Sequence, residues 1–220
     1  MKTHYYFGWF NDVFLEKLVR LLHEDITDRK SLVMISANPF LHEDEEVGAT
    51  ERSWLDQANI MFDEYYLIDY GVQKEEAKKL IQNASVIFLL GGNTVEQNGI
   101  LIEYELSDLI KKSRAVVMGT SAGAINMSAK WLCSKYTDDK GKISSIYDGI
   151  GLDDFSVLSH CDLENNIPQI QGELSPLLEE MNVYASNKDC AVRVKGDKID
   201  ILGNVYLISH SKIQKLDETL

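Results

Sequence analysis

The sequence predicts an α/β fold with a mostly parallel central sheet and helices on both faces. Two observations carry this prediction. Short apolar runs of strand length alternate with segments whose apolar residues recur at helical spacing. The runs are continuously apolar, as expected for parallel strands that helices cover on both faces. No linker, internal repeat or low-complexity tract interrupts the 220 residues, so we expect a single domain over residues 1–220.

The first half of the chain alternates strands and helices in a regular way. Predicted strands cover residues 5–10, 31–36, 65–68, 86–90 and 115–118. Predicted helices begin near Phe14 and cover residues 50–62, 73–83 and 95–112, and another begins within residues 119–124. Between the second strand and its helix, an Asn-Pro pair and an acidic run predict a loop.

After about Trp131 the alternation changes. Residues 155–160 resemble a strand and residues 168–181 a helix. Residues 191–194 and 199–202 alternate around a Lys-Gly-Asp turn, and residues 205–209 form a third short run. We therefore expect a C-terminal antiparallel extension of the sheet.

Composition limits the classes of partner. The formal charge is −13, from 35 acidic against 22 basic residues, so nucleic acid and anionic membrane surfaces are not expected partners. The three cysteines are widely spaced and form no Cys-x-x-Cys or Cys/His cluster, which argues against a structural metal. We expect a cytoplasmic protein. The cysteine count is odd and low, and the sequence shows neither a signal peptide nor a ~20-residue apolar run.

The strongest chemical signal is the run Gly-Thr-Ser-Ala-Gly at residues 119–123. It matches G-x-S-x-G and lies between a buried strand and a helix, the context in which a serine hydroxyl projects above the sheet edge. Ser121 is therefore the candidate nucleophile, and the N–H of Ala122 can face a developing oxyanion. A tight turn that merely needs small residues for packing is the alternative.

A second glycine-rich run, Gly91-Gly92-Asn93-Thr94, also follows a predicted buried strand. Parallel sheets bind ligands at such strand ends. Gly92 can supply a second oxyanion donor, and we expect Asn93 and Thr94 to contact the substrate. The alternative is an ordinary helix start, with Asn93 or Thr94 as the N-cap.

A serine nucleophile needs a base, and histidine is the usual one. Of the five histidines, His160 ends a predicted strand, where its side chain can overhang the sheet edge, whereas His210 lies near the C-terminus. We favour His160. No metal or organic cofactor is needed for this chemistry.

These motifs resemble one known family. The run LLGGNT, GTSAGA about 30 residues later, and the Gly149–His160 segment are similar to the serine peptidase family of aspartyl dipeptidase (peptidase E) and cyanophycinase, over most of the chain. The resemblance implies a class I glutamine amidotransferase-like (flavodoxin-like) sandwich. It also implies that Ser121 is the nucleophile, His160 the base, and Gly92 and Ala122 the oxyanion donors.

The resemblance also implies an acid that orients the histidine. The alignment places Lys188 at that position, with Asp189 next to it, so a one-residue shift makes Asp189 the first candidate. Asp138 follows the nucleophile helix and is a second candidate, also expected near the substrate, and Asp162 is a third by proximity to His160.

The expected substrate is a small peptide. Aspartyl dipeptidases hold the substrate carboxylate with an arginine after the catalytic histidine, but residues 161–180 contain no Arg or Lys. A buried carboxylate without a cation is costly, so we do not expect specificity for N-terminal Asp. We expect a monomer or a homodimer.

Two other readings stay open. An α/β-hydrolase-type esterase also uses G-x-S-x-G, with the acid before the histidine; His210 would then be the base and Asp153 or Asp154 the acid. The lysine at position 188 also leaves room for a non-catalytic binding module on a peptidase fold.

Overall fold

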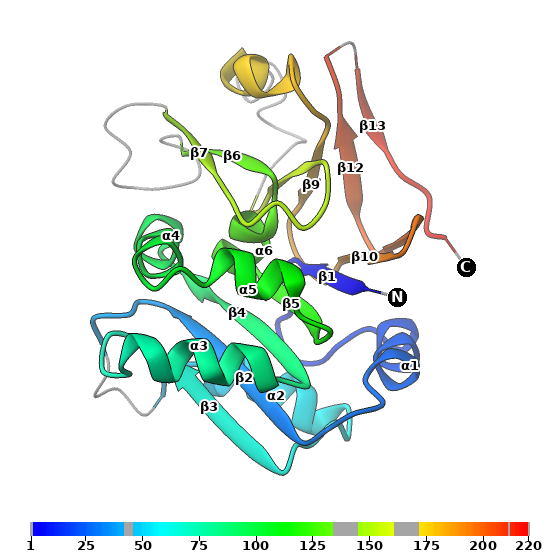
Figure 1. Cartoon of the computed structure of the whole chain (residues 1–220). Helices are drawn as coiled ribbons and strands as arrows, with labels where there is room; N and C mark the ends of the chain where they lie inside the picture. Colours follow the sequence, from blue (N-terminus) through cyan, green and yellow to red (C-terminus); the bar gives the residue numbers. More distant parts are fainter. Residues whose placement is uncertain (1, 42–45, 134–144, 161–171, 211, 220) are drawn as a thin grey trace.

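The computed structural model describes residues 2–41, 46–133, 145–160, 172–210 and 212–219. Within these ranges, a seven-stranded central sheet has the order β11-β10-β1-β5-β4-β2-β3 (Figure 1). Neighbours from β1 to β3 are parallel, and β10 and β11 join antiparallel beside β1. The strands are β1 (Thr3–Phe7), β2 (Ser31–Ala37), β3 (Glu64–Ile68), β4 (Val86–Gly92), β5 (Val116–Thr120), β10 (Ala191–Lys195) and β11 (Lys198–Leu202).

Helices cover both faces of this sheet, which confirms the predicted fold class. On β2, Val33 and Ile35 pack into one apolar core, while Leu32 and Met34 pack into the other, because successive side chains of a strand point to opposite faces. One face carries α1 (Glu16–Asp25) and α2 (Ala49–Gln57), and the other α3 (Lys74–Asn83), α4 (Thr94–Glu103), α5 (Ser107–Lys112) and α6 (Ala122–Met127). Among the described residues, no helix is long and apolar enough to cross a bilayer.

The C-terminal third differs from the expectation in one respect. Residues 205–209 were expected to extend the central sheet, but β12 pairs instead with β9 in a second sheet of order β13-β12-β9-β8. The chain leaves the edge strand β11 at Gly203, whose φ of +71° turns it away. The strands are β8 (Ser156–Leu158), β9 (Val183–Ser186), β12 (Val205–Ile208) and β13 (Ile213–Lys215), and β6 (Lys130–Cys133) and β7 (Ser145–Asp148) form a separate hairpin.

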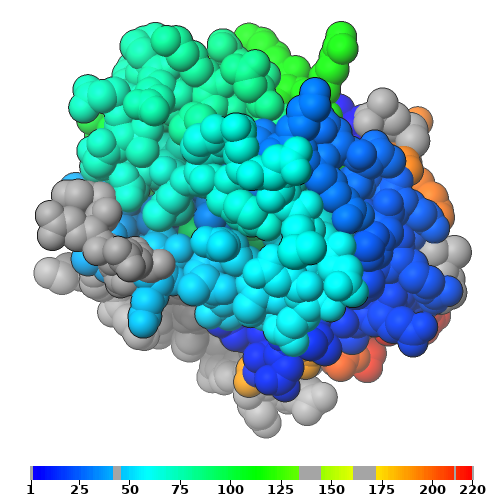
Figure 2. All heavy atoms as spheres, turned by 90° about the horizontal axis from the view of Figure 1, so that it is seen from below, coloured from blue at the N-terminus to red at the C-terminus, as the bar shows by residue number. Residues whose placement is uncertain are grey.

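The two sheets divide the chain by sequence. The second sheet and the hairpin lie on the opposite side of the central sheet from β3 (Figure 1). Figure 2, which views the β3 side, shows a face whose coloured atoms come mainly from the first half of the chain. The second sheet therefore lies on the side of the central sheet that carries β1, β10 and β11.

The predicted helix over residues 95–112 is wrong in its continuity, because α4 and α5 are separate. The break is a left-handed turn at Glu105, with φ of +56°. The Leu106 N–H donates to the Leu101 carbonyl and the Glu105 N–H to the Ile102 carbonyl, the hydrogen bonds of a Schellman helix end. No glycine marks this end, so the helical periodicity hides it.

Candidate active site

Ser121 lies at the turn between β5 and α6, at the carboxyl end of a central strand. Its backbone has φ of +49° and ψ of −112°, a conformation that residues other than glycine rarely adopt. Such strain persists only where the surrounding structure enforces it, and it is typical of functional turns. The turn directs the Ser121 hydroxyl into a pocket, as the motif predicts.

The two glycines of the motif are required by packing. A Cβ at Gly123 would lie 2.0 Å from the Leu89 carbonyl oxygen, and one at Gly119 would lie 2.6 Å from both the Gly123 carbonyl carbon and Met127 Sδ. Because α6 packs this closely on β4, its first turn stays next to the carboxyl end of that strand. The packing alternative and the functional interpretation of the motif are therefore compatible.

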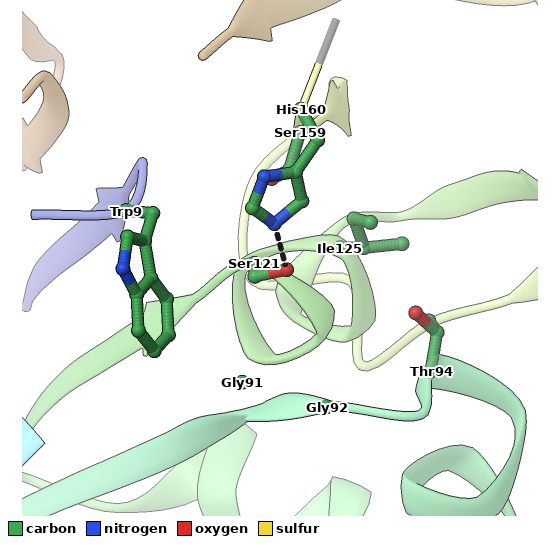
Figure 3. Close-up of a pocket in the computed structure, with 8 residues that line it drawn as sticks. All are labelled: Trp9, Gly91, Gly92, Thr94, Ser121, Ile125, Ser159 and His160. Carbon is green, nitrogen blue, oxygen red and sulfur yellow. Dashed lines mark hydrogen bonds between the residues drawn. The ribbon is translucent and has the colours of Figure 1, made fainter. Parts of the chain in front are cut away.

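His160 follows β8 of the second sheet, and its ring lies above Ser121 in Figure 3. Its Nε2 lies 2.7 Å from Ser121 Oγ, a hydrogen-bonding distance for a nucleophile and its base. Partial burial and the positive charge of Lys188 both lower the pKa of the His160 imidazole. The ring is therefore neutral near pH 7 and able to accept a proton.

Lys188 lies next to this site, in the chain segment that precedes β10. It forms an isolated parallel bridge with Trp9, whose side chain lines the Ser121 pocket. The carboxylate of the next residue, Asp189, accepts hydrogen bonds from the backbone N–H and the side chain of Asn11, at 3.4 and 3.3 Å.

The pocket has a volume of about 390 Å³. Figure 3 shows Trp9 on one side of Ser121, Thr94 and Ile125 on the other, and the Gly91–Gly92 strand end below. Gly92 has φ of +141°, and a Cβ there would lie 2.8 Å from Asn38 Nδ2, so this position also needs glycine. The lining residues are Trp9, Gly91, Gly92, Thr94, Ser121, Ile125, Ser159 and His160.

Several expected site residues lie as the sequence suggested. Ser121 and His160 meet, and Gly92 and Thr94 line the same pocket. Ala122 begins α6 directly after Ser121 and is buried.

Other expected residues are engaged elsewhere. Asn93 caps α4, because its Oδ1 accepts hydrogen bonds from the N–H groups of Val95 and Glu96, at 3.0 and 3.1 Å. The structure does not bring the Asp189 carboxylate to His160, since it bonds Asn11. Asp138 and Asp162 lie outside the described residues.

The esterase arrangement is not the one that the structure shows. His160, not His210, bonds Ser121. The Asp153 carboxylate accepts a hydrogen bond from Tyr6 at 2.6 Å and contacts His4 Nδ1 at 2.9 Å. It therefore contributes to packing between β1 and the segment before β8.

Sequence analysis missed four residues of the site region. Trp9, Ile125 and Ser159 line the pocket, and Glu51 bonds the strand end below it. Glu51 had a usable signal, because it shares the apolar face of α2 with Trp54 and Leu55, three and four positions later.

A model of peptidase family S51 matches residues 13–202. The chain belongs to peptidase family S51. Membership supports a serine peptidase, which is a hydrolase. No functionally curated protein matches the sequence.

Two solved structures show the same fold as this S51 chain. A peptidase from an acI-B1 actinobacterium has a TM-score of 0.68 and 17% identity, over 99% of this chain and 95% of that one. A putative peptidase E protein from Listeria monocytogenes EGD-e has a TM-score of 0.63 and 20% identity, over 99% of this chain and 100% of that one. They agree with the mostly parallel sheet between helices.

Proposed function

We propose that this S51 chain is a serine-type peptidase that hydrolyses small peptides, with Ser121 as nucleophile and His160 as general base. The observation that carries the proposal is the 2.7 Å contact between Ser121 Oγ and His160 Nε2 at a strained strand-to-helix turn. Family membership supports the same reaction class.

In the proposed reaction, Ser121 Oγ attacks the scissile carbonyl carbon while His160 Nε2 takes the hydroxyl proton. His160 then gives this proton to the leaving amine as the C–N bond breaks. Water attacks the resulting acyl-enzyme with His160 again as the base, and the acid product leaves with Ser121 restored.

The oxyanion is proposed to lie between the N–H groups of Gly92 and Ala122. The Asn93 N–H donates to Ala37 on β2 at 3.1 Å, and successive N–H groups of a strand point to opposite sides. This alternation favours an orientation of the Gly92 N–H toward β5, the strand that Ser121 directly follows. Ala122 is the first residue of α6, and its N–H has no acceptor within that helix.

The pocket volume suits a short peptide. Because residues 161–180 carry no Arg or Lys, we propose that N-terminal Asp is not the preferred residue. None of the described residues hydrogen-bonds His160 Nδ1, so we assign no acid that orients this ring.

Covalent labelling tests the nucleophile directly. A fluorophosphonate is expected to label the wild-type protein on Ser121, and hydrolysis of a dipeptide panel is expected to fall by about 10⁴-fold or more in Ser121→Ala. Ser107→Ala, on α5, is the matched control and should retain labelling and rate. Wild-type rates in Ser121→Ala would remove this proposal, and an unlabelled, inactive wild-type protein would favour the binding-module alternative.

A further inference from the structure

Glu51 is a buried carboxyl next to the proposed active site that the reaction above does not use. It lies in the first turn of α2 and is only 5% exposed. Its Oε1 accepts a hydrogen bond from the backbone N–H of Gly91, at 3.1 Å. Gly91 lines the Ser121 pocket, so Glu51 supports that pocket from behind.

Among the described residues, no Lys, Arg or His forms an ion pair with Glu51. Burial raises the pKa of Glu51 above its ordinary value, although hydrogen bonds from Gly91 and from its own backbone N–H oppose this. Burial of such a group is unfavourable for stability, and the other buried residues of α2, Trp54 and Leu55, are apolar.

The strand end that Glu51 contacts needs external support. Gly91 and Gly92 are consecutive, and glycine has more backbone freedom than any other residue. The flanking residues are fixed on both sides: Gln97 Nε2 donates to the Leu90 carbonyl at 3.1 Å, and the Asn93 N–H donates to Ala37 at 3.1 Å. Between these anchors, the Glu51 contact fixes the Gly91 N–H.

We infer that Glu51 is a positioning residue, whose carboxyl oxygen holds Gly91 so that the following peptide presents the Gly92 N–H to the oxyanion. The inference rests on the proposed function, because it assigns a role to the proposed oxyanion donor. Glu51 acts through the backbone and touches no reacting atom.

Two substitutions of Glu51 distinguish the effect of its hydrogen-bond acceptor from the effect of its charge. Glu51→Gln retains an oxygen acceptor for the Gly91 N–H and is expected to keep most of the activity. Glu51→Met removes the acceptor but fills the same apolar space, so the protein should fold. A misplaced donor can cost about 10²-fold in rate, so kcat should fall by about that factor in Glu51→Met with little change in KM. Asp56→Asn, an exposed position on the same helix, is the charge-matched control.

A second kinetic readout distinguishes positioning from a general structural effect. For an ester and its thionoester analogue, the ratio of kcat/KM measures how well oxyanion donors favour oxygen over sulfur. This ratio should fall in Glu51→Met and stay near the wild-type value in Glu51→Gln. An unchanged ratio in Glu51→Met, or equal losses in the Met and Gln variants, would overturn the inference.

A measurement independent of activity separates this inference from the proposed function. Amide hydrogen exchange at Gly91 and Gly92 should accelerate in Glu51→Met and not in Glu51→Gln. If wild-type protein proves inactive but this pattern holds, the proposed function fails while the positioning contact stands. If the wild-type protein is active but exchange is the same in all three proteins, the positioning role fails.

Discussion

Two buried carboxylate sites lie on the same face of the central sheet, and they are built in opposite ways. Asp25, at the end of α1, is bonded by Arg193 Nε at 2.7 Å and by Lys195 Nζ at 2.6 Å. Within the part of the chain that the structure describes, Glu51, at the start of α2, is bonded by backbone N–H groups and by no Lys, Arg or His. The first site balances its charge, and the second does not.

The direction of each pKa shift follows from this difference. Burial alone would raise the pKa of Asp25, but hydrogen bonds from Arg193 and Lys195 hold it below its ordinary value. Burial raises the pKa of Glu51, and no cation among the described residues reverses the shift. A balanced buried group is consistent with a structural role. An unbalanced one is expected where its geometry serves a function.

We expect the Asp25 site to govern stability and the Ser121 pocket to govern reaction rate. His160→Ala gives the largest expected effect, a fall in kcat/KM of about 10³-fold or more, because the hydroxyl of Ser121 loses its proposed base. The thermal unfolding temperature should change little, since the His160 side chain is only partly buried. His210→Ala is the control with near wild-type rates. Equal losses in both variants would contradict the separation of roles.

Arg193→Met tests the expected contribution of the Asp25 site to stability. Arg193 is 4% exposed and bonds both Asp25 and Asp200, so its removal should lower the free energy of unfolding by about 3 kcal/mol. The activity per folded molecule should not change. Lys112→Met is the control, because the Lys112–Asp108 pair is exposed and contributes less than about 1 kcal/mol. Urea unfolding measures both.

The same variant has an expected pH dependence. The pKa values of Asp25 and Asp200 are lowered in the folded state, where burial opposes the shift and their cationic partners produce it. Their stabilisation is therefore present above the unfolded-state pKa near 4 and is lost as the pH falls. Arg193→Met should flatten the acid side of the stability profile. A loss of activity without a loss of stability would contradict the assignment.

Sequence reasoning located the strand-to-helix turn of Ser121, the proposed nucleophile, because short-range packing constrains this turn. Gly119 and Gly123 are needed where α6 packs against β4 and β5. The small residues around Ser121 therefore indicate this close packing in the sequence. Continuous apolar runs predicted the central strands for a similar reason, since both of their faces are buried.

The position of the Asp189 carboxylate, the second sheet and the role of Glu51 could not be predicted from the sequence. Asp189 has φ of +48°, and this single backbone angle accompanies a carboxylate directed at Asn11. The second sheet has strands of three or four residues, too short for a periodic signal. Glu51 resembles an ordinary helix acid until its neighbours on the apolar face of α2 are considered.

Lys188→Gln gives the smallest expected effect. Like the Asp25 site, it concerns a cation that shifts a pKa, but here the cation lies next to the Ser121 pocket. The positive charge of Lys188, together with burial, lowers the pKa of His160. Its removal makes protonation of the ring less unfavourable, so the acidic limb of the kcat/KM profile should move toward higher pH. High salt should reduce the difference between the two proteins, since it screens exposed charges. Lys212→Gln, at an exposed position after β12, is the control. An acidic limb that stays in place or moves to lower pH would mean that Lys188 does not tune the base.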